Sequence, residues 1–433
     1  MVEPLQLAML GGGTVGGGVA KILLGHADRI TSRAGRPVQL RHVVVRDPAK
    51  TRPSIPKEII STDWKAAVHD PQVHVVVELM GGTTTAKMAV MEALAAGKHV
   101  VTANKALLAE HGAEIFEHAR RHERVVAFEA SVAGGIPIIG ALSQSLTANQ
   151  VTALQGILNG TSNFILTSMA DKGMSYADAL KEAQRLGYAE ADPTLDVDGS
   201  DAAHKLAILV QLAFGVTATL GDIERQGIDG LSAMDLRFAQ ELGYTVKLLA
   251  EAWLEGKEVA LHVAPVLLRH TDMLAQVRGA FNAIQIKGDA VGEVLFQGPG
   301  AGELPTASSV VGDIIDIAVG RAQRTFAASK LWSGSPQGFV LRPSQGVKSR
   351  FYLRVLVADK PGVLADVARV LADEQISIAT VIQHEAQEEH AEAVVPLVIM
   401  THYAETGRFR SALDKLNKLP GVVSPGVSYS VDD

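Results

Sequence analysis

The chain contains no cysteine among its 433 residues. This absence excludes disulfide bonds, zinc sites built from thiolates and every mechanism that uses a thiol as the nucleophile. Long apolar runs are also missing, since no stretch approaches the roughly 18 consecutive apolar residues that cross a bilayer. The first residues, MVEPLQLAMLGGG, have no basic segment ahead of their apolar part and do not resemble a signal peptide. We therefore expect a cytoplasmic protein with no membrane partner.

An excess of positive charge is absent as well. The net charge is −7, so we expect no nucleic-acid partner, because such a partner requires clustered Lys and Arg. Hydrophobic residues make up 47% of the chain and charged residues 20%, which is typical of a globular protein. The length exceeds what one hydrophobic core supports and predicts roughly three domains.

A glycine-rich stretch follows the first apolar run, Leu5 to Leu10. It reads GGGTVGGGVAKILLG and places Gly11, Gly13 and Gly16 in a G-x-G-x-x-G pattern that opens a helix ending near Gly25. The first glycine permits a tight turn, the second lets the backbone approach a pyrophosphate, and the third allows close packing of helix on strand. A turn between packed elements is the alternative. The position between a strand and a helix favours a dinucleotide site, with the phosphates at the helix N-terminus.

The end of the second predicted strand, Val38 to Val45, bears on the choice of cofactor. An acidic residue at this point binds the ribose hydroxyls of NAD, whereas an arginine accommodates the 2′-phosphate of NADP. Here Arg46 comes first and Asp47 follows. The sequence therefore favours NADP(H) and leaves NAD(H) possible. Arg46 as a solvated loop charge is the alternative.

Strands and helices then alternate through the first third of the chain, which predicts a parallel sheet covered on both faces. The strands are expected at 73–77, 99–102 and 124–128, and the helices at 85–96 and 106–122. Ligands bind at the carboxyl ends of such strands. The segments ELMGGTTT and TANK follow two of these ends, and the second places Lys105 beside the expected nicotinamide position. A helix-start charge is the alternative, but a helix dipole does not favour lysine there.

Acidic residues gather in the middle of the chain, between Gly187 and Lys205. This segment reads GYAEADPTLDVDGSDAAHK and runs directly into the apolar segment LAILVQLAF. Asp201 and Lys205 are four residues apart, so they share one face of a helix. A surface ion pair is the alternative. The apolar residues that follow indicate an interior helix, where a carboxylate and an ammonium are costly unless paired, and this favours a functional site.

The rest of the middle region predicts a mixed α+β domain. Strands are expected at 151–158, 259–268 and 283–288, helices at 164–172, 175–186 and 307–319, and a turn with capping residues at NGTSN. A second glycine-rich loop within VGEVLFQGPGAG precedes the last of these helices and can reach the cofactor. Residues 322–350 have little periodicity and several Ser, Gly and Pro breaks, which predicts a linker.

The last 85 residues, approximately, predict a small β-α-β-β-α-β module. Strands are expected at 351–357, 377–384 and 394–401 and near Val422, with helices at 363–373 and 408–418. Gln387 to Glu392 is expected to form an acidic hairpin. Modules of this kind pair through edge strands or helices, which indicates a homo-oligomer.

Taken together, these motifs resemble the bacterial homoserine dehydrogenases that carry a C-terminal ACT regulatory domain. The resemblance covers essentially the whole chain and rests on GGGTVGGG, LMGG, TANKALLA, EASVAGGIPII, GILNGTSNFIL, GYAEADPTLDVDGSDAAHKLAIL, GPGAGELPTASSVVGDI and DKPGVLA. It implies a Rossmann dinucleotide-binding domain (1–135), an α+β substrate and dimerisation domain with a mixed sheet (136–321), the linker (322–350) and the ACT domain (351–433). A helix near 304–321 is expected to pack back on the first domain. The family interconverts L-aspartate 4-semialdehyde and L-homoserine with NAD(P)H, on the route to threonine, methionine and isoleucine.

The resemblance also implies roles for individual residues. Lys205 matches the general acid/base, and Lys105 a second lysine at the cofactor and substrate. Glu190 and Asp201 match the groups that bind the amino acid, and Asp201 is expected either to hold the substrate amino group or to orient Lys205 in catalysis. From the segment itself, Asp196 is expected to contact the substrate or to support a residue that does, whereas Asp192 and Asp198 are expected to be turn and helix-capping residues. The implied cofactor-binding residues are Gly11, Gly13, Thr14, Val15, Gly16, Arg46, Lys105, Gly187 and Gly302. A loop that holds sodium or another monovalent cation through its carbonyls matches Glu129, Val132, Gly134 and Ile136.

Two other functions compete with this interpretation. Aspartate-semialdehyde dehydrogenase, a different dehydrogenase of amino-acid metabolism, needs a cysteine nucleophile, and the chain has none. A non-catalytic amino-acid sensor would not need Glu190, Asp201 and Lys205, and all three are present.

Regulation is expected in the terminal module. ACT-like domains bind amino acids near their first turn, here Asp359, Gly362, Val363 and Leu364, and threonine is the expected effector. Paired modules imply a homodimer or homotetramer.

Overall fold

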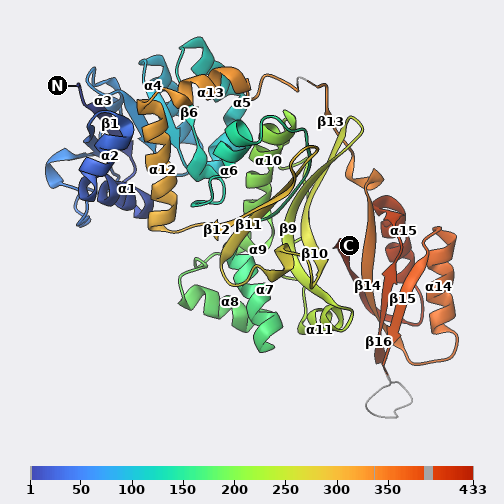
Figure 1. Ribbon diagram of the computed structural model, residues 1–433. Coiled ribbons are helices and arrows are strands. Elements are labelled where there is room, and N and C mark those ends of the chain that lie inside the picture. The colour runs from blue at the N-terminus through green and yellow to red at the C-terminus, as the bar shows by residue number, and fades with distance from the viewer. Residues whose placement is uncertain (1, 336, 385–393, 433) are drawn as a thin grey trace. The chain divides into compact units, whose positions relative to one another are not determined.

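The computed structural model describes residues 2–335, 337–384 and 394–432 (Figure 1). These residues form two compact units. One contains the described residues of the segments Met1–Leu154, Ala203–Asp222 and Phe281–Val340, and the other contains those of Gln155–Ala202, Ile223–Ala280 and Leu341–Asp433. The chain passes between the units within strand β7 (Val151–Ile157) and helix α10 (Ser200–Phe214), among other places. The predicted hairpin at 387–392 lies outside the described residues.

The first unit contains a parallel sheet with the strand order β3-β2-β1-β4-β5-β6. Its strands are β1 (Leu5–Leu10), β2 (Val38–Val44), β3 (Ile60–Ser61), β4 (Val75–Glu78), β5 (His99–Thr102) and β6 (Val126–Ala127). Strand order reverses between β1 and β4, and ligands bind at this point in open parallel sheets. The prediction of an alternating α/β domain is confirmed, and β1 and β5 have the predicted limits.

The connecting segments of this sheet are helical. They include α1 (Thr14–Gly25), α2 (Ala27–Ala34), α3 (Trp64–His69), α4 (Thr84–Ala95) and α5 (Lys105–Arg121). After the sheet, α6 (Ile138–Gly140) begins the segment that leads to β7. The unit also includes the antiparallel pair β11 (Phe281–Gly288) and β12 (Gly292–Pro299).

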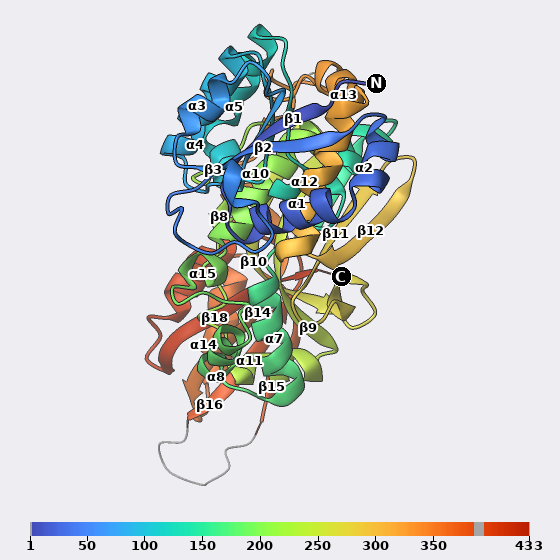
Figure 2. The same cartoon turned by 90° about the vertical axis from the view of Figure 1, so that its left-hand side faces the viewer.

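Helix α12 (Glu303–Ala318) belongs to the same unit although it follows long after the sheet in sequence. It lies alongside α1 in both views (Figures 1 and 2). Gly18 of α1 allows this approach, because a Cβ there would lie 2.7 Å from the carbonyl oxygen of Glu303. Val310 and Ile314 are fully buried in the core that also contains Leu7 of β1. Burial of this apolar face therefore attaches α12 to the dinucleotide-type sheet.

Part of the predicted linker is a packed helix. Helix α13 (Arg321–Ser329) occupies its beginning, and the ring of Phe326 stacks on that of Phe116 at a centroid distance of 5.5 Å. Trp332 lies closer still, with its ring centroid 4.4 Å from that of Phe116. The helix escaped prediction because its apolar residues are few and their pattern spans little more than two turns.

The second unit contains a sheet in which the strands follow the order β9-β10-β18-β14-β16-β15. Its first two strands, β9 (Tyr244–Glu255) and β10 (Glu258–Arg269), form a long antiparallel pair. Strand β9 was not predicted, because its buried residues face both sides and leave no alternation in the sequence. The helices of this unit's middle part are α7 (Gly160–Lys172), α8 (Tyr176–Arg185), α9 (Thr194–Val197) and α11 (Ala233–Glu241).

The terminal module has the predicted β-α-β-β-α-β order. It consists of β14 (Lys348–Ala358), α14 (Val363–Asp373), β15 (Ile378–Gln383), β16 (Val394–Thr401), α15 (Thr406–Leu416) and β18 (Val422–Asp432). Strand β18 also pairs in parallel with β10, with Val266 opposite Ser430. One edge of the module's sheet is thereby covered within the chain. Among the described residues, no helix is long and apolar enough to cross a membrane.

Candidate active site

The glycine loop between β1 and α1 has two different kinds of glycine. Gly11 has a φ of +119°, and a Cβ at this position would lie 2.4 Å from the carbonyl oxygen of Leu79. A Cβ at Gly16 would lie 2.2 Å from the carbonyl oxygen of Gly11. Gly13 has nothing within 4 Å of its Cβ position. The fold therefore requires Gly11 and Gly16, whereas Gly13 leaves open space in which a ligand could approach the backbone.

Gly13 is also the N-cap of α1, and no side chain caps that helix. The backbone N–H groups of the first turn, including those of Thr14 and Val15, are thus left to a ligand or solvent. A helix N-terminus with this arrangement favours a phosphate. The predicted pyrophosphate site fits the geometry.

The tip of β2 is held against this loop by an arginine that was not among the predicted site residues. Arg46 and Asp47 are both exposed just beyond the strand. Arg52 donates from Nε to the carbonyl oxygen of Gly12 at 2.9 Å and from Nη1 to that of Asp47 at 2.9 Å. Arg52 therefore positions Asp47 and the adjoining Arg46 beside the glycine loop.

The carboxyl ends of β4 and β5 are joined by a buried glutamate. Glu78 is fully buried and accepts a hydrogen bond from the Thr102 hydroxyl at 2.7 Å and one from the Met80 N–H at 2.8 Å. Burial raises the pKa of the Glu78 carboxyl. Asn104 donates to the carbonyl oxygen of Gly82 at 2.7 Å and caps α5, whose first residue is Lys105. The two predicted ligand-binding segments are thus fastened together where Lys105 begins its helix.

Gly187 and Glu190 lie in the turn that ends α8. Gly187 has a φ of +78°. The N–H of Tyr188 donates to the carbonyl oxygen of Ala183 at 2.9 Å, which is the pattern of a glycine-terminated helix. Gly187 therefore has a structural reason to be glycine. The Glu190 side chain is exposed, and its carbonyl oxygen accepts a hydrogen bond from the Gln184 amide.

Asn159, which follows β7, brings two of the predicted carboxylates together. Its Nδ2 donates to Asp196 Oδ1 at 2.8 Å and to Asp201 Oδ2 at 2.9 Å. Its Oδ1 accepts the N–H of Ser162 at 2.8 Å, so Asn159 is also the N-cap of α7. The sequence identified the NGTSN segment only as a capped turn. One sign of the second role of Asn159, which is to hold Asp196 and Asp201, was its position as a polar residue directly after a predicted strand.

The two remaining acidic residues of the segment have the predicted local roles. Asp192 Oδ1 accepts hydrogen bonds from the N–H and the hydroxyl of Thr194, at 3.1 and 2.6 Å. Asp198 Oδ1 accepts the N–H of Ser200 at 2.8 Å, and its Oδ2 accepts the Ser200 hydroxyl at 2.9 Å. Both aspartates therefore stabilise turns, and these predictions are confirmed.

Helix α10 is the interior helix that the sequence predicted. Asp201 and Lys205 lie one turn apart on it, with exposed fractions of 8% and 9%. Leu206 and Leu209 are fully buried in the turns that follow. A carboxylate held by Asn159 and an ammonium on the same buried face form a polar site in otherwise apolar surroundings.

Comparison with known proteins now decides the family. A model described as "Homoserine dehydrogenase" matches residues 137–315, one described as "Homoserine dehydrogenase, NAD binding domain" matches residues 11–129, and the ACT domain model matches residues 351–421. The chain belongs to the homoserine dehydrogenase family. It is therefore an oxidoreductase with a dinucleotide-binding domain, a catalytic domain and a C-terminal ACT domain.

Individual homoserine dehydrogenases agree over the full length. The chain is 43% identical to the homoserine dehydrogenase of Neisseria gonorrhoeae over 429 residues, which span 98% of each protein. It is 42% identical to that of Pseudomonas aeruginosa over 440 residues, which span 100% of this chain and 99% of the relative. The crystal structure of a homoserine dehydrogenase from Thiobacillus denitrificans matches with a TM-score of 0.93 and 42% identity, covering 100% of this chain and 99% of that one.

The loop predicted to hold a monovalent cation in homoserine dehydrogenases has unusual backbone geometry here. Ala133 and Gly134 are consecutive left-handed residues, with φ of +54° and +48°. The Gly134 carbonyl oxygen accepts the Ser309 hydroxyl at 2.7 Å. Val132 and Ile136 on either side are buried, with exposed fractions of 0% and 2%.

The side chain of Glu129 caps the backbone at the start of α6. Its Oε1 and Oε2 accept the N–H groups of Ile139 and Gly140, both at 2.8 Å, at the start of α6. Its own N–H donates to Asp313 Oδ2 at 2.9 Å. Burial, and then the Glu129 charge, raise the pKa of Asp313 well above its usual range. Asp313 was not predicted. The charge of each of these partly buried carboxyl groups disfavours ionisation of the other, which favours uptake of a cation or a proton.

Side chains alone do not form a metal centre elsewhere in the described residues. There, no group of three or more His, Asp or Glu side chains could hold a metal ion. A site built from backbone carbonyls would not be found by such a search of side chains. Cation binding by the loop that contains Glu129, Val132, Gly134 and Ile136 therefore stays a prediction.

The four predicted effector residues lie at the first turn of the ACT module. Gly362 has a φ of +97° and is the N-cap of α14. Asp359 is exposed and Leu364 has an exposed fraction of 43%, whereas Val363 is partly buried. Gly302, which was predicted to contact the cofactor, belongs to the first unit. It has a φ of +117° and is the N-cap of α12.

Proposed function

We propose that the chain catalyses the reversible NAD(P)H-dependent reduction of L-aspartate 4-semialdehyde to L-homoserine, in the biosynthesis of threonine, methionine and isoleucine. The observation that carries this proposal is the pair of hydrogen bonds that Asn159 donates to Asp196 and Asp201. Asp201 lies one helical turn before Lys205 on α10. These hydrogen bonds preorganise two carboxylates for the amino group of an amino-acid substrate, and Lys205 is then available for the reacting oxygen.

The bound nicotinamide cofactor supplies or accepts the hydride. Hydride addition to an aldehyde creates an alkoxide, which needs a proton and positive potential at the oxygen. Lys205 Nζ delivers this proton and takes it back in the reverse direction, and Lys105 adds positive potential. Asp201, Glu190 and Asp196 hold the substrate amino group. Burial of the α10 face excludes water, which strengthens each of these interactions.

The test is turnover in both directions, with dinucleotide binding measured separately. Lys205→Ala should lose most of kcat while keeping its affinity for NADPH. Lys98→Ala removes another buried lysine, one that bonds the backbone carbonyls of Asp70 and Val73, and should keep turnover if it folds. Near wild-type turnover of Lys205→Ala would show that the acid/base lies elsewhere.

We also propose a preference for NADP(H), with Thr14, Val15 and the three glycines on the pyrophosphate and Gly187 and Gly302 as further contacts. Arg46 supports the NADP(H) preference, because Arg52 holds the segment that contains Arg46 beside the glycine loop. Arg46→Ala should raise the KM for NADPH and leave that for NADH unchanged. An equal effect on both would contradict the preference.

Sodium or another monovalent cation is proposed to bind the carbonyls of Glu129, Val132, Gly134 and Ile136. The support is the pair of left-handed residues in that loop and the nearby carboxyl groups of Glu129 and Asp313. Turnover measured in sodium and in a large organic cation tests this directly.

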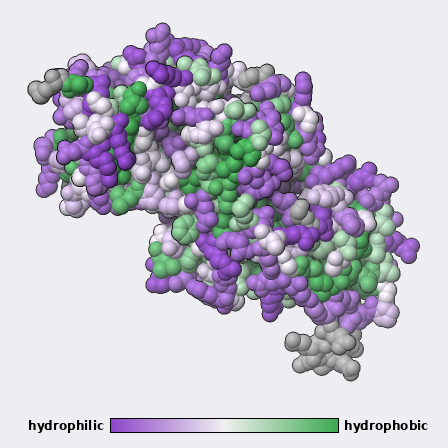
Figure 3. Space-filling model, in the orientation of Figure 1, coloured by the Kyte–Doolittle hydropathy of each residue, from purple (hydrophilic) through white to green (hydrophobic). Residues whose placement is uncertain are grey.

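The ACT module is proposed to bind threonine between paired copies, so that the enzyme is a homodimer or homotetramer. Apolar residues gather on the drawn face over β15 and α14 (Figure 3), and Val381 and Leu364 are 40% and 43% exposed. Asp359, Gly362, Val363 and Leu364 would contact the effector. Turnover and molecular mass measured with and without threonine test the proposal. The domain limits 1–135, 136–321 and 351–433 and a cytoplasmic location are proposed with it.

A further inference from the structure

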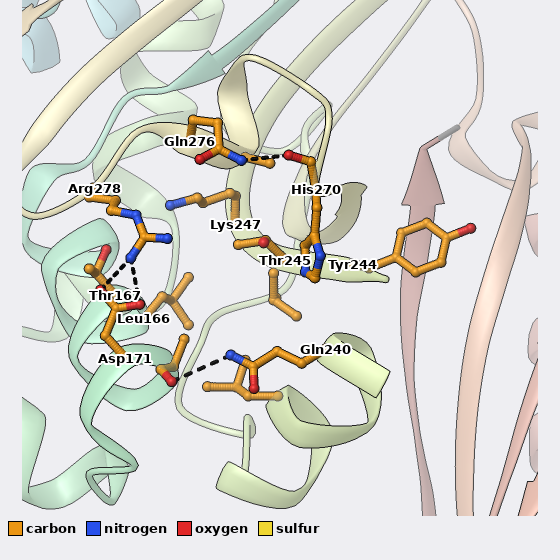
Figure 4. A pocket seen from close by; sticks show the side chains of 14 residues that line it. Leu166, Thr167, Asp171, Gln240, Tyr244, Thr245, Lys247, His270, Gln276 and Arg278 are labelled. Carbon is orange, nitrogen blue, oxygen red and sulfur yellow. Dashed lines mark hydrogen bonds and ion pairs between the residues drawn. The ribbon is translucent and has the colours of Figure 1, made fainter. Parts of the chain in front are cut away.

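A cavity of about 400 Å³ lies within the second unit (Figure 4). It is bordered by α7, α11, β9 and the segment that follows β10. Its wall carries Lys247, Arg278, Asp171 and His270 together with apolar residues. The proposed reaction uses none of these four side chains.

Lys247 is the most unusual of them, because it is a buried ammonium whose hydrogen bonds within the described part of the chain go to uncharged oxygens. Its exposed fraction is 2%. Nζ donates to Asn163 Oδ1 at 3.0 Å and to the carbonyl oxygen of Val277. Burial first, and then the charge of Arg278, lower the pKa of Lys247 to about 8. An ammonium in this position gains from any anion that reaches it.

Asp171, the carboxylate that the described residues place in the cavity wall, is already paired with Arg278. Both oxygens of Asp171 accept hydrogen bonds from Arg278 Nη1, at 2.7 Å. Both side chains stand at the mouth of the cavity, with exposed fractions of 63% for Arg278 and 40% for Asp171. Figure 4 shows the Lys247 ammonium directed toward the Arg278 guanidinium. Lys247 and Arg278 against Asp171 leave this wall with one positive charge in excess.

We propose that this cavity binds a small carboxylate, with Lys247 as its counter-ion. The cavity is large enough to admit a small carboxylate, and the apolar wall of Leu166, Leu236 and Ala275 suits a short aliphatic group. Arg278 at the mouth attracts the anion. The carboxylate takes the place that a protein carboxylate would fill in an ordinary buried ion pair.

A carboxylate bound in the cavity is expected to affect the proposed substrate site through α7. Asn163, which accepts a hydrogen bond from Lys247, also donates to the carbonyl oxygen of Gly279 at 2.9 Å. One turn earlier on the same helix, Asn159 holds Asp196 and Asp201. A carboxylate that draws Lys247 away from Asn163 therefore loosens the helix that positions both aspartates. This consequence rests on the proposed function, whereas binding itself does not.

Acetate is the probe for binding, titrated calorimetrically into the full-length protein at constant ionic strength against chloride. Wild-type protein should bind acetate saturably, and Lys247→Met should weaken binding by at least roughly tenfold, which corresponds to ~1.4 kcal/mol. Lys98→Met is the matched control, because Lys98 is also buried at 7% and bonded to two backbone carbonyls but does not line this cavity. It should bind acetate like the wild type.

A second variant keeps the proposal testable if Lys247→Met fails to fold. Ala170→Phe is expected to fill the cavity from α7 while Lys247 stays in place, and it should abolish acetate binding. Absence of saturable binding to the wild type, or undiminished binding to Ala170→Phe, overturns the proposal. In turnover assays, acetate should raise the KM for homoserine in the wild type and not in Ala170→Phe. Confirmed binding without a KM effect would overturn the coupling through α7. A complete lack of turnover would instead count against the proposed reaction.

Discussion

Arg354 forms a two-point ion pair with Asp235, with Nε 2.6 Å from Oδ1 and Nη2 3.0 Å from Oδ2. Both residues are buried, with exposed fractions of 8% and 1%, and the Tyr352 hydroxyl donates to the same carboxylate at 3.1 Å. Arg354 and Tyr352 lie on β14 of the ACT module. Asp235 lies in the first turn of α11, where it forms a capping box with Ser232. The ACT module is therefore bonded to a helix that borders the Lys247 cavity.

Loss of the arginine alone should be costly. Arg354→Leu leaves the Asp235 carboxylate buried without its counter-ion, which destabilises proteins by about 3–5 kcal/mol. Urea unfolding of the full chain measures this. Arg342→Leu is the control, since Arg342 pairs with the half-exposed Glu255 and Glu258 and should lose at most about 1 kcal/mol. Equal losses in the two variants would mean that Arg354 contributes no more than a surface pair.

Asn159→Ala should separate capping from substrate binding. The lost N-cap costs about 1 kcal/mol of stability. Release of Asp196 and Asp201 should in addition raise the KM for homoserine by roughly tenfold, a loss of ~1.4 kcal/mol in binding. Ser175→Ala removes the N-cap of α8, which holds no predicted site residue, and should cost similar stability with an unchanged KM. A KM that rises equally in both variants would reduce Asn159 to a structural cap.

The glycines of the dinucleotide loop should divide into two classes. Gly16→Ala places a Cβ against the Gly11 carbonyl and should lose about 1–3 kcal/mol of unfolding free energy. Gly13→Ala meets nothing within 4 Å and should unfold nearly like the wild type, yet bind NADPH roughly tenfold more weakly, or ~1.4 kcal/mol. Urea unfolding and NADPH fluorescence titration make the comparison. Tight NADPH binding by Gly13→Ala would place the pyrophosphate elsewhere.

Local patterns were enough to predict most of the fold. The glycine loop, the alternating first third and the β-α-β-β-α-β module each carry a signal within a few residues, and the helix at 363–373 has the predicted limits. Strand β9 and helix α13 were missed because tertiary packing, rather than a local period, determines them. The pairing of β18 with β10 joins residues more than a hundred positions apart, and no short pattern encodes it.

The candidate site was predictable only in part, for the same reason. Asp192 and Asp198 act on neighbouring residues, so the sequence revealed their roles. Asn159 acts on carboxylates 37 and 42 positions away, and Lys247 on Asn163 84 positions away. Such contacts exist only after the chain has folded, which is why these positioning residues escaped notice.

A final prediction concerns pH and His99. The neutral ring accepts the Val125 N–H at Nδ1, at 3.2 Å, and burial first, with the charge of Arg124 second, lowers the pKa of His99 to about 4 from 6.5. Between these two values the unfolded chain binds more protons than the folded one, so stability should fall as the pH falls through this window. After allowance for partial exposure, the loss should be about 2 kcal/mol.

Replacement of His99 by Asn keeps an acceptor for the Val125 N–H and removes the titrating ring. Unfolding in urea at pH values from 4 to 7 should show a wild-type stability that declines relative to His99→Asn as the medium becomes more acidic. His122→Asn, which removes an exposed ring from the end of α5, is the control and should follow the wild type. Parallel curves for the wild type and His99→Asn would mean that the ring accepts a proton as readily in the folded chain as in the unfolded one.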